Sequence, residues 1–391
     1  MLEPFRLFVS AGESSSDIHC AQLVKELKNQ MSNRTLEVFG LGGEALADAG
    51  VNLIMHNREL NSGGGPIEVI GRIPKRRELE KKVEALLLEK KINGAILVDN
   101  GEINLRLAAL LNFFEVPVVY FIPPKVWVWR EYRLNAIAGH VQKVLGILPF
   151  EKSIYDKWEI PFEYVGNPLV DEIAEITRQQ AIERLGLDSN KKYLAVFFGS
   201  RFSEIKQHVE IFSKALEMFY EKLEDLKLEK PDLLVPVAQN IDLNELESRV
   251  KKQFPTTHFY KGESHAILKA SHAALVKSGT STLEAAYLRV PNVLAYQVAK
   301  SSIWFFRNIV RYKGFIGLAN LFFGKIVVPE CVLEECTPEK ISSELFDVWV
   351  NKDRREKMDE EFAKLKVLMT PQECKPMVRA AQACVEVFQN V

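Results

Sequence analysis

The amino-acid sequence predicts an α/β protein with two doubly wound domains, each built around a parallel sheet. Two observations support this prediction. Short runs of β-branched and aromatic residues alternate with helical patterns along the whole chain, which is typical of βαβ units. The chain of 391 residues is also longer than one hydrophobic core usually supports, so two domains are expected.

The predicted strands fall into two series along the chain. The first series comprises Arg6–Ala11, Leu36–Leu41, Ala95–Asp99, Val116–Ile122, Lys143–Leu148 and Glu163–Val165. The second comprises Tyr193–Phe198, Leu233–Val237, His258–Tyr260, Ala274–Lys277 and Asn292–Tyr296. Most of the segments between these strands are long enough for the crossover helices that parallel strands require.

Helices are predicted where apolar residues recur on one face. The clearest helix begins near Ser203, with Ile205, Val209, Phe212, Leu216, Phe219 and Leu223 on that face. The tail is predicted to be helical over Glu339–Asn351, Arg354–Leu368 and Pro376–Phe388. Because Gly166, Asn167 and Pro168 interrupt the pattern, we expect an N-terminal domain at 1–168 and a C-terminal domain at 169–345. Helices within 346–391 would pack on the N-terminal domain or on a partner subunit.

Composition and charge limit the classes of function. Lys and Arg number 51 and Asp and Glu 52, so no nucleic-acid partner is expected. The five cysteines are scattered and lack zinc-site spacing, which favours a reducing cytosol and no structural metal. The chain has no signal-peptide pattern and no run of about 18 apolar residues, so we expect it neither to span a membrane nor to be exported.

Ligands of doubly wound sheets bind beyond the carboxyl ends of the strands, so the turns after the strands form the candidate site. The first turn carries Glu13, the serines 14–16 and Asp17. Two carboxylates would repel a diphosphate, so this turn suits sugar hydroxyls unless a serine and Asp17 only cap the next helix. The glycine-rich dinucleotide fingerprint is absent, which argues against a nicotinamide enzyme.

Three further stretches of the first domain are candidates. Residues 63–75 predict a glycine-rich loop followed by a helix. Asp99 and Glu102 follow a strand and can supply a general base, although such residues also favour local turn hydrogen bonds. Residues 122–133 combine aromatic rings with cations, which suits a sugar or an amphiphile, while a packed interdomain surface is the alternative. The residues concerned in this last stretch are Trp127, Trp129, Arg130 and Arg133.

Two turns of the second domain predict phosphate contacts. Arg201 lies in the first turn of a helix, where a cation opposes the macrodipole, so a bound phosphate would explain it; a surface arginine is the alternative. The backbone amides of Gly199 and Ser200 would complete that site. Residues 278–281 repeat the arrangement and would face a phosphate, with Glu284 toward ribose hydroxyls; a capping box between Ser281 and Glu284 is the alternative.

One aromatic segment, residues 301–324, mixes large apolar side chains with cations at roughly helical spacing. This pattern favours an interfacial membrane segment, and a dimer interface or a domain core is the alternative.

Taken in order, these motifs resemble those of the lipid-A-disaccharide synthases, inverting glycosyltransferases whose two Rossmann-like domains face a cleft in the GT-B architecture. The resemblance covers residues 6 to about 375 and depends on SAGESSSD, GGPIEVIGR, the turn at Asp99, VWVWR, LPFEKSIYDKWEIPFEYVGNPLVDE, GSR, KSGTSTLEA and GLANLFFGKIVVPE. The family joins UDP-2,3-diacylglucosamine to 2,3-diacylglucosamine 1-phosphate and releases UDP and the β-1,6-linked lipid A disaccharide. The resemblance implies a cytoplasmic enzyme of Gram-negative bacteria that is peripheral on the inner membrane, needs no metal or cofactor, and can form a homodimer.

The resemblance also implies roles for single residues. Asp99 would take the proton from the acceptor 6-hydroxyl, with Glu13 and Ser15 on the facing wall. Arg201 and helix N-termini would stabilise the departing diphosphate. The other substrate-binding candidates are Asp17, Glu68, Trp127, Arg130, Gly199, Ser200, Ser278, Gly279, Thr280, Ser281, Glu284 and Asn320.

The chain departs from the family pattern at four places. Ser16 stands where glycine is usual, Asn100-Gly101-Glu102 follows Asp99 where the family has x-Pro-Asp, Asn167 replaces a histidine, and Gln297 replaces an arginine. These changes leave a second interpretation open, in which the chain is a family member that has lost turnover and only binds a nucleotide sugar or lipid. Another GT-B enzyme, such as a UDP-N-acetylglucosamine epimerase, is the remaining alternative.

Overall fold

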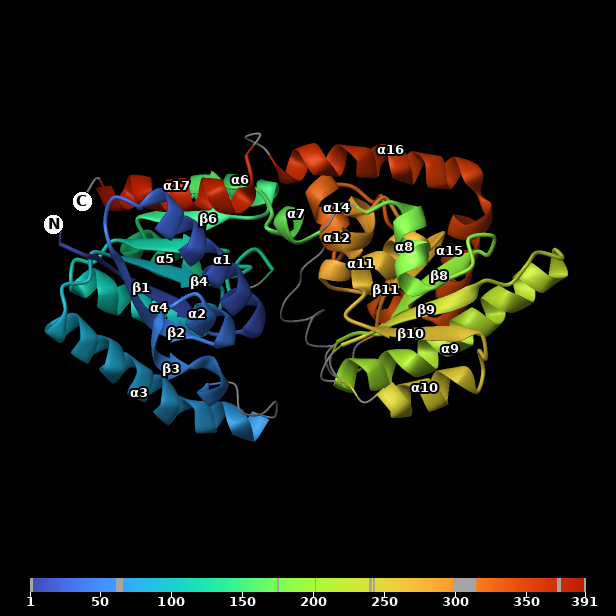
Figure 1. Cartoon of the computed structure of the whole chain (residues 1–391), viewed down its shortest axis with the longest axis horizontal. Coiled ribbons are helices and arrows are strands. Elements are labelled where there is room, and N and C mark those ends of the chain that lie inside the picture. The colour runs from blue at the N-terminus through green and yellow to red at the C-terminus, as the bar shows by residue number, and fades with distance from the viewer. Residues whose placement is uncertain are drawn as a thin grey trace. The chain divides into compact units, whose positions relative to one another are not determined.

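The computed structural model describes residues 3–60, 66–128, 130–173, 176–200, 202–238, 241, 243–297, 314–370 and 374–389, except for the side chains of 66–73, 203 and 245. The chain forms two compact units (Figure 1). The first contains Met1–Asp171 and Met369–Val391, and the second contains Glu172–Leu368. The second unit is therefore an insertion in the sequence of the first.

The first unit contains a sheet of seven parallel strands in the order β3-β2-β1-β4-β5-β6-β7. The strands are β1 Phe5–Ala11, β2 Leu36–Gly42, β3 Asn52–His56, β4 Gly94–Val98, β5 Val118–Phe121, β6 Lys143–Gly146 and β7 Phe162–Tyr164. The winding direction changes between β1 and β4, where Ala11 lies opposite Val98. The turns that follow these two strands therefore leave the sheet side by side.

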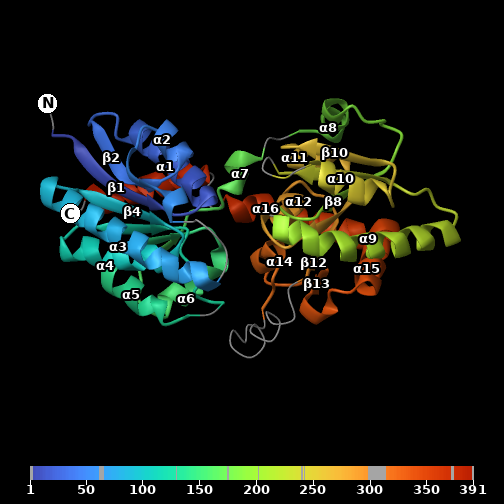
Figure 2. The ribbon, with the colours of Figure 1, turned by 90° about the horizontal axis from the view of Figure 1, so that it is seen from below.

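Helices cover both faces of the first sheet, as expected for a parallel sheet in which the side chains of each strand point alternately to two buried faces. Figure 2 shows α1 and α2 on one side and α3, α4 and α5 on the other. Along β1, Leu7 and Val9 belong to the first of these cores and Phe8 to the second. The helices of this unit are α1 Ser14–Gln30, α2 Glu44–Asp48, α3 Pro66–Glu89, α4 Gly101–Phe113, α5 Arg133–His140, α6 Lys152–Asp156, α7 Leu169–Glu172 and α17 Pro376–Gln389.

The second unit repeats the design with six parallel strands in the order β10-β9-β8-β11-β12-β13. The strands are β8 Tyr193–Phe197, β9 Asp232–Val237, β10 Thr257–Lys261, β11 Ala273–Lys277, β12 Asn292–Tyr296 and β13 Glu330–Val332. The helices are α8 Arg178–Leu185, α9 Phe202–Asp225, α10 Leu243–Lys251, α11 Ser264–Ala270, α12 Thr280–Tyr287, α14 Leu318–Phe323, α15 Pro338–Val350 and α16 Lys352–Met369. The winding changes between β8 and β11, where Phe197 lies opposite Val276.

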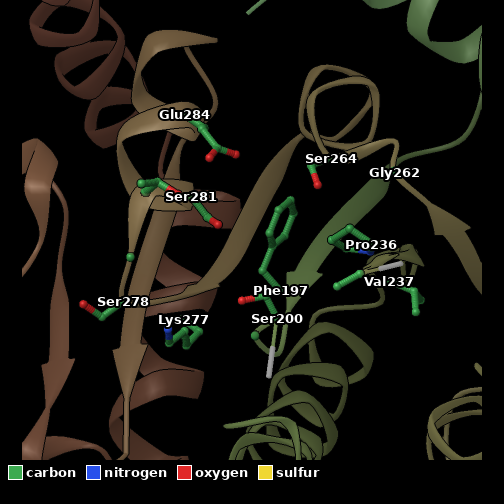
Figure 3. Close-up of a pocket in the computed structure, with 14 residues that line it drawn as sticks. Phe197, Ser200, Pro236, Val237, Gly262, Ser264, Lys277, Ser278, Ser281 and Glu284 are labelled. Atoms are coloured by element: carbon green, nitrogen blue, oxygen red, sulfur yellow. The ribbon is translucent and has the colours of Figure 1, made fainter. Parts of the chain in front are cut away.

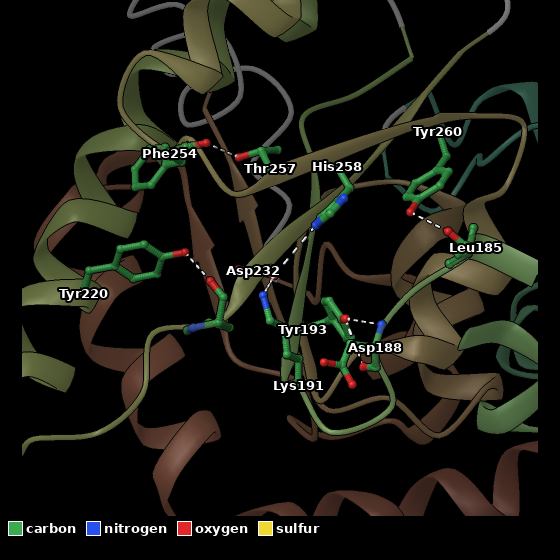
Figure 4. Close-up of polar contacts among 11 residues, drawn as sticks. Leu185, Asp188, Lys191, Tyr193, Tyr220, Asp232, Phe254, Thr257, His258 and Tyr260 are labelled. Carbon is green, nitrogen blue, oxygen red and sulfur yellow. Dashed lines mark hydrogen bonds and ion pairs between the residues drawn. The ribbon is translucent and has the colours of Figure 1, made fainter. Parts of the chain in front are cut away.

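Hydrogen bonds and ion pairs connect the amino ends of strands in the second unit to neighbouring segments (Figure 4). Asp232, the first residue of β9, lies 2.9 Å from Lys191 Nζ and 3.7 Å from His258 Nε2. The Tyr193 hydroxyl at the start of β8 accepts a hydrogen bond from the Asp188 amide and donates one to its carbonyl. These contacts stabilise the edge of the sheet opposite to the carboxyl ends, where ligands of such folds bind.

The predicted architecture of two doubly wound parallel sheets is confirmed. Two short strands, β3 and β13, were not predicted, because β3 begins and ends on Asn52 and His56 and β13 has only three residues. The chain divides after Asp171, close to the expected boundary at 168. Of the helices expected within 346–391, α16 belongs mainly to the second unit and α17 to the first.

The last helix, α17, completes the core of the first unit. Its Met377, Ala380, Cys384 and Phe388 are buried in the same cluster as the inward face of α1, beside which it lies (Figure 1). An added Cβ at Gly94 would come within 2.6 Å of the Phe388 ring, so the close packing of this ring needs glycine at that position.

Only the end of the aromatic segment 301–324 can be examined, since residues 301–313 lie outside the described ranges. In α14, Ala319, Leu321 and Phe322 are buried, and the Phe323 ring stacks on Phe362 with centroids 6.4 Å apart. This part of the segment forms domain core. No helix within the described ranges is long and apolar enough to cross a bilayer.

Candidate active site

The turns that follow β1, β4 and β5 converge at the carboxyl edge of the first sheet. An added Cβ at Gly12 would lie 2.6 Å from Asn100 Nδ2, and one at Gly101 would lie 2.9 Å from Arg133 Nη1 and 3.0 Å from Pro124. The three predicted turns are therefore in contact. A side chain at either position would displace these neighbouring side chains, so glycine allows the turns to approach closely.

Asp99 directly follows β4 and is half-buried at this edge. Burial raises the pKa of its carboxyl group, and a hydrogen bond from the Asn100 backbone and the charges of Lys125 and His19 offset part of that rise. A desolvated carboxylate with a raised pKa is a stronger base than an exposed one. The structure thus supplies the property that a general base needs at this position.

Glu102, the second carboxylate of this turn, has different surroundings. It lies 2.7 Å from Arg76 Nη2 and 3.2 Å from Arg130 Nη1. Partial burial acts to raise the pKa of Glu102, but the two guanidinium groups outweigh it and the net pKa is lowered. Glu102 is therefore an ion-pair partner rather than a second base, and it engages Arg130, which the sequence had suggested for substrate binding.

In the opening turn, the structure separates exposed residues from structural ones. Glu13 and Ser15 are exposed. Ser16 is buried, and its hydroxyl accepts a hydrogen bond from the Glu13 amide and donates one to the Glu13 carbonyl, so this departure from glycine fits inside the turn. Asp17 has a structural role: its buried carboxylate accepts hydrogen bonds from the amides of Gly43, Ala45 and Leu46 and holds the start of α2, while its contact with substrate stays a prediction.

Trp127 lies over a buried carboxyl group. Its indole nitrogen donates a hydrogen bond of 3.2 Å to Glu151 Oε1, and its ring meets Phe150 edge-on at 5.0 Å. Burial raises the pKa of Glu151 to about 7, against the smaller effects of that hydrogen bond, the Leu148 backbone and Lys125. Trp129 and the side chain of Glu68 lie outside the described residues.

The second unit contains a pocket of about 320 Å³ at the carboxyl edge of its sheet (Figure 3). The pocket brings together the two turns that the sequence predicted for phosphate binding, namely Gly199 and Ser200 after β8 and residues 278–281 after β11. Glu284 lines the same pocket from α12. Sequence reasoning missed the remaining lining residues, which are Phe197, Pro236, Val237, Ala238, Gly262, Ser264 and Lys277.

Lys277 places a cation in this pocket. Its Nζ lies 3.0 Å from Glu204 Oε1 and 5.6 Å from the centre of the Tyr296 ring. Nζ is also 3.8 Å from the position that a Cβ at Gly279 would take, so the charge stands beside the turn before α12. In the sequence, the only indication of this cation was a lysine that ends a predicted buried strand immediately before Ser-Gly-Thr.

The start of α12 does not contain the capping box that was the alternative explanation for Ser281 and Glu284. The helix begins at Thr280 with Gly279 as its N-cap and no side-chain cap, so Ser281 is already helical. Glu284 lies inside the pocket instead, where burial raises the pKa of its carboxyl group and the nearby His265, the Thr280 hydroxyl and Glu172 modify that rise. The start of α12 is thus left available for a ligand.

Asn320 has a structural role as well, while its contact with UDP stays a prediction. Its side chain is fully buried and donates hydrogen bonds to the Val328 carbonyl and Glu330 Oε1. It also accepts hydrogen bonds from the amides of Val327 and Val328, so it holds the loop before β13 together. Arg201 lies outside the described residues.

Of the two remaining departures from the family pattern, Asn167 is accommodated by hydrogen bonds of its side chain. It is buried, donates to the Ile147 carbonyl and accepts from the Leu169 amide. At Gln297 the backbone N–H donates to His208 Nε2 at 3.2 Å, a contact that does not depend on the side chain. Across the described ranges, no group of three or more His, Cys, Asp or Glu side chains is arranged to hold a metal ion.

Solved structures of epimerases and glycosyltransferases share the fold of this chain. The UDP-GlcNAc 2-epimerase of Neisseria meningitidis bound to UDP-GlcNAc superimposes with a TM-score of 0.60 and 13% identity, covering 99% of this chain and 100% of that one. The calicheamicin glycosyltransferase CalG4 gives a TM-score of 0.62 and 13% identity, covering 100% of this chain and 99% of that one. These likenesses identify the GT-B fold.

Sequence comparisons are more specific. The family model for lipid-A-disaccharide synthetase matches residues 7–384. The lipid-A-disaccharide synthase of Myxococcus xanthus is 36% identical over 391 residues, covering 99% of each chain. That of Nitrosococcus oceani is 31% identical over 361 residues, covering 92% of this chain and 90% of its own. The chain therefore belongs to the lipid-A-disaccharide synthetase family.

Proposed function

We propose that this chain transfers the diacylglucosamine group of UDP-2,3-diacylglucosamine to the 6-hydroxyl of 2,3-diacylglucosamine 1-phosphate. The products are the β-1,6-linked lipid A disaccharide and UDP. The observation that carries the proposal is the pocket of the second unit, which joins the glycine turns after β8 and β11 in a chain of this family. This pocket has the hydroxyls, backbone amides and cation that a nucleoside diphosphate needs.

In this proposal the UDP half of the donor occupies the pocket. Its diphosphate lies between Gly199 and Ser200 on one side and residues 278–281 on the other, against the start of α12. Lys277 and Arg201 supply positive charge, and Glu284 accepts hydrogen bonds from the ribose hydroxyls. Asn320 acts indirectly, by holding the loop before β13.

The acceptor sugar lies at the carboxyl edge of the first sheet. Asp99 takes the proton of the 6-hydroxyl while the oxygen attacks the anomeric carbon of the donor. The bond from that carbon to the UDP oxygen breaks as the new one forms, so a single displacement inverts the anomeric centre. The exposed Glu13 and Ser15 face the sugar, and the negative charge that develops on UDP is stabilised by Arg201, Lys277 and the helix start.

We further propose that the protein works at the cytoplasmic surface of the inner membrane, as a peripheral protein and as a homodimer. Both proposed substrates carry acyl chains, which either stay in a lipid layer during transfer or have to be drawn out of it. Sedimentation with anionic vesicles and light scattering test these two points separately. Protein that stays in the supernatant at every lipid concentration, or that scatters as a monomer, would remove the corresponding point.

The decisive experiment follows UDP release and the mass of the lipid product, with both substrates in detergent and no divalent metal. The wild type should form the disaccharide, whereas Asp99→Asn should lose at least a thousandfold in kcat and keep its UDP affinity within about threefold. Glu102→Gln is the matched control, since it neutralises the neighbouring carboxylate that is already paired with arginines.

The alternatives give different results in the same assay. UDP binding without any disaccharide, even at high enzyme concentration, would indicate a family member that has lost turnover. Conversion of UDP-N-acetylglucosamine without an acceptor would indicate an epimerase. A near-normal rate of Asp99→Asn would remove Asp99 from the role of base.

A further inference from the structure

The backbone at Asp99 is strained. Asp99 and Asn100 both have positive φ angles, 51° and 38°, in the left-handed region that Asp and Asn enter more often than other non-glycine residues but still seldom. Two such residues in succession are held only where surrounding contacts fix them. The question is which contacts hold the turn that carries the proposed base.

A buried set of hydrogen bonds ends on the carbonyl of Asp99. The Tyr120 hydroxyl donates to this carbonyl at 2.7 Å, and Asn104 Nδ2 donates to it at 2.8 Å. Asn104 Nδ2 also donates to the Val98 carbonyl at 2.9 Å. The Ser10 hydroxyl donates to Asn104 Oδ1 at 2.6 Å, which fixes the orientation of the amide. Tyr120, Asn104 and Ser10 are each 0% exposed.

These bonds act on the backbone of Asp99. Its carboxylate accepts a hydrogen bond from the Asn100 backbone and forms no ion pair with any residue that the structure describes. Burial, together with the negative charge of Asp99, raises the pKa of Tyr120, so the hydroxyl keeps its proton and remains a donor. The donors come from β1, α4 and β5, so three elements fix one peptide unit.

We infer that Tyr120 and Asn104, oriented by Ser10, are positioning residues that hold the Asp99 carboxylate in its reactive place by clamping the Asp99 carbonyl. The inference rests on the proposed function for its effect on rate. Without the clamp, the turn relaxes toward ordinary φ angles and the carboxylate moves away from the acceptor hydroxyl and toward solvent. Small displacements of a catalytic group lower kcat without weakening substrate binding.

The test is Tyr120→Phe, which removes one clamp bond and keeps the ring. Tyr155→Phe is the matched control, because Tyr155 is also fully buried, its ring stacks on Phe162 at 5.0 Å, and its hydroxyl has no hydrogen-bond partner within the described part of the chain. We expect Tyr120→Phe to lower kcat about tenfold or more, with KM for both substrates unchanged. Tyr155→Phe should stay within about twofold of the wild type.

Two further readouts separate positioning from a general loss of structure. In an Asp99→Asn background, Tyr120→Phe should have no further effect on the residual rate, because the clamp acts only through the carboxylate. A ¹³C NMR titration should show a lower pKa of the Asp99 carboxyl group in Tyr120→Phe than in the wild type, since greater exposure removes the effect of burial. Ser10→Ala provides a milder variant should Tyr120→Phe fold poorly, with the same direction of change.

The outcomes are distinct. The inference would be overturned if Tyr120→Phe and Tyr155→Phe lost equal amounts of kcat, or if Tyr120→Phe had the same effect with and without Asp99. An unchanged pKa of Asp99 in Tyr120→Phe would also overturn it. If the wild type transfers no sugar but the Asp99 pKa still falls in Tyr120→Phe and Ser10→Ala, the proposed function fails and the clamp stands.

Discussion

Replacing Lys277 by Met should separate the recognition of the diphosphate from the recognition of the nucleoside. The side chain keeps its length and loses its charge, so Glu204, which is 15% exposed, loses its ion pair with Lys277 beside the pocket. A diphosphate on the turn at Gly279 would then lose the attraction of Lys277 and face the Glu204 carboxylate without that neighbouring positive charge. Uridine carries no charge and would lose neither interaction.

The structure sets the size of the effect. Because Lys277 Nζ lies 3.8 Å from the Cβ position at Gly279, a phosphate bound to this turn would be roughly 5 Å from the cation. Two unit charges at that distance interact by about 3 kcal/mol at an effective dielectric constant of 20. Since Lys277 is 18% exposed and already paired, we expect about half of this or somewhat more. The Kd for UDP should rise about 10- to 100-fold, and that for uridine less than about twofold.

Calorimetric titration of the two ligands at low and high salt measures this difference. Lys206→Met is the control, because it removes the same charge from an exposed position of α9. Glu204→Gln in the Lys277→Met background should restore part of the UDP affinity. Equal weakening of UDP and uridine would mean that Lys277 only shapes the pocket, and no weakening of either would refute the placement of the diphosphate.

Three other perturbations test separate parts of the molecule. Because burial raises the pKa of Asp99, kcat/KM should fall as the pH falls through a value above the usual 3.9 or so of an aspartate, and an acidic limb below pH 4 would contradict this. Glu151 has a folded-state pKa of about 7, so the folded protein binds more protons than the unfolded chain between about pH 4.5 and 7. The free energy of unfolding of the wild type should therefore fall by about 3 kcal/mol as the pH rises through that window. Urea unfolding of Glu151→Gln at pH 5 and pH 8 should show this dependence removed. Asn320→Ala should destabilise the second unit by about 3 kcal/mol in urea unfolding, because it leaves buried loop amides without partners. A weaker UDP complex at unchanged stability would instead indicate that Asn320 contacts the ligand directly.

The sheets were predictable because their central strands are continuous apolar runs. Strands such as Gly94–Val98 and Ala273–Lys277 are buried on both faces, which leaves a clear sequence signal. The edge strands β3 and β13 lack that signal, since one begins and ends on polar residues and the other has three residues. Their pairing depends on neighbours that are distant in the sequence.

The candidate site was predictable where a glycine turn follows a strand, and less so elsewhere. This rule located Ser200 and Ser278 on one pocket, but it did not locate Pro236, which lines the same pocket from within β9, or Gly262, which directly follows β10. A polar residue within a motif serves the fold as readily as a ligand, as Asp17 shows by holding α2. Ion pairs with distant residues, such as that of Glu102 with Arg76, are likewise invisible to local patterns.

The position of α17 has a consequence for the order in which the protein folds during synthesis. The ribosome makes the first sheet early, but Gly94 and the inner face of α1 lack their contacts with Phe388 and the rest of α17 until this helix, which follows the second unit in the sequence, has been made. The second unit, Glu172–Leu368, is complete before that moment and can fold first. A nascent chain stalled near residue 370 would thus present a finished C-terminal unit beside an N-terminal one with an open apolar face, which is the kind of surface that chaperones bind.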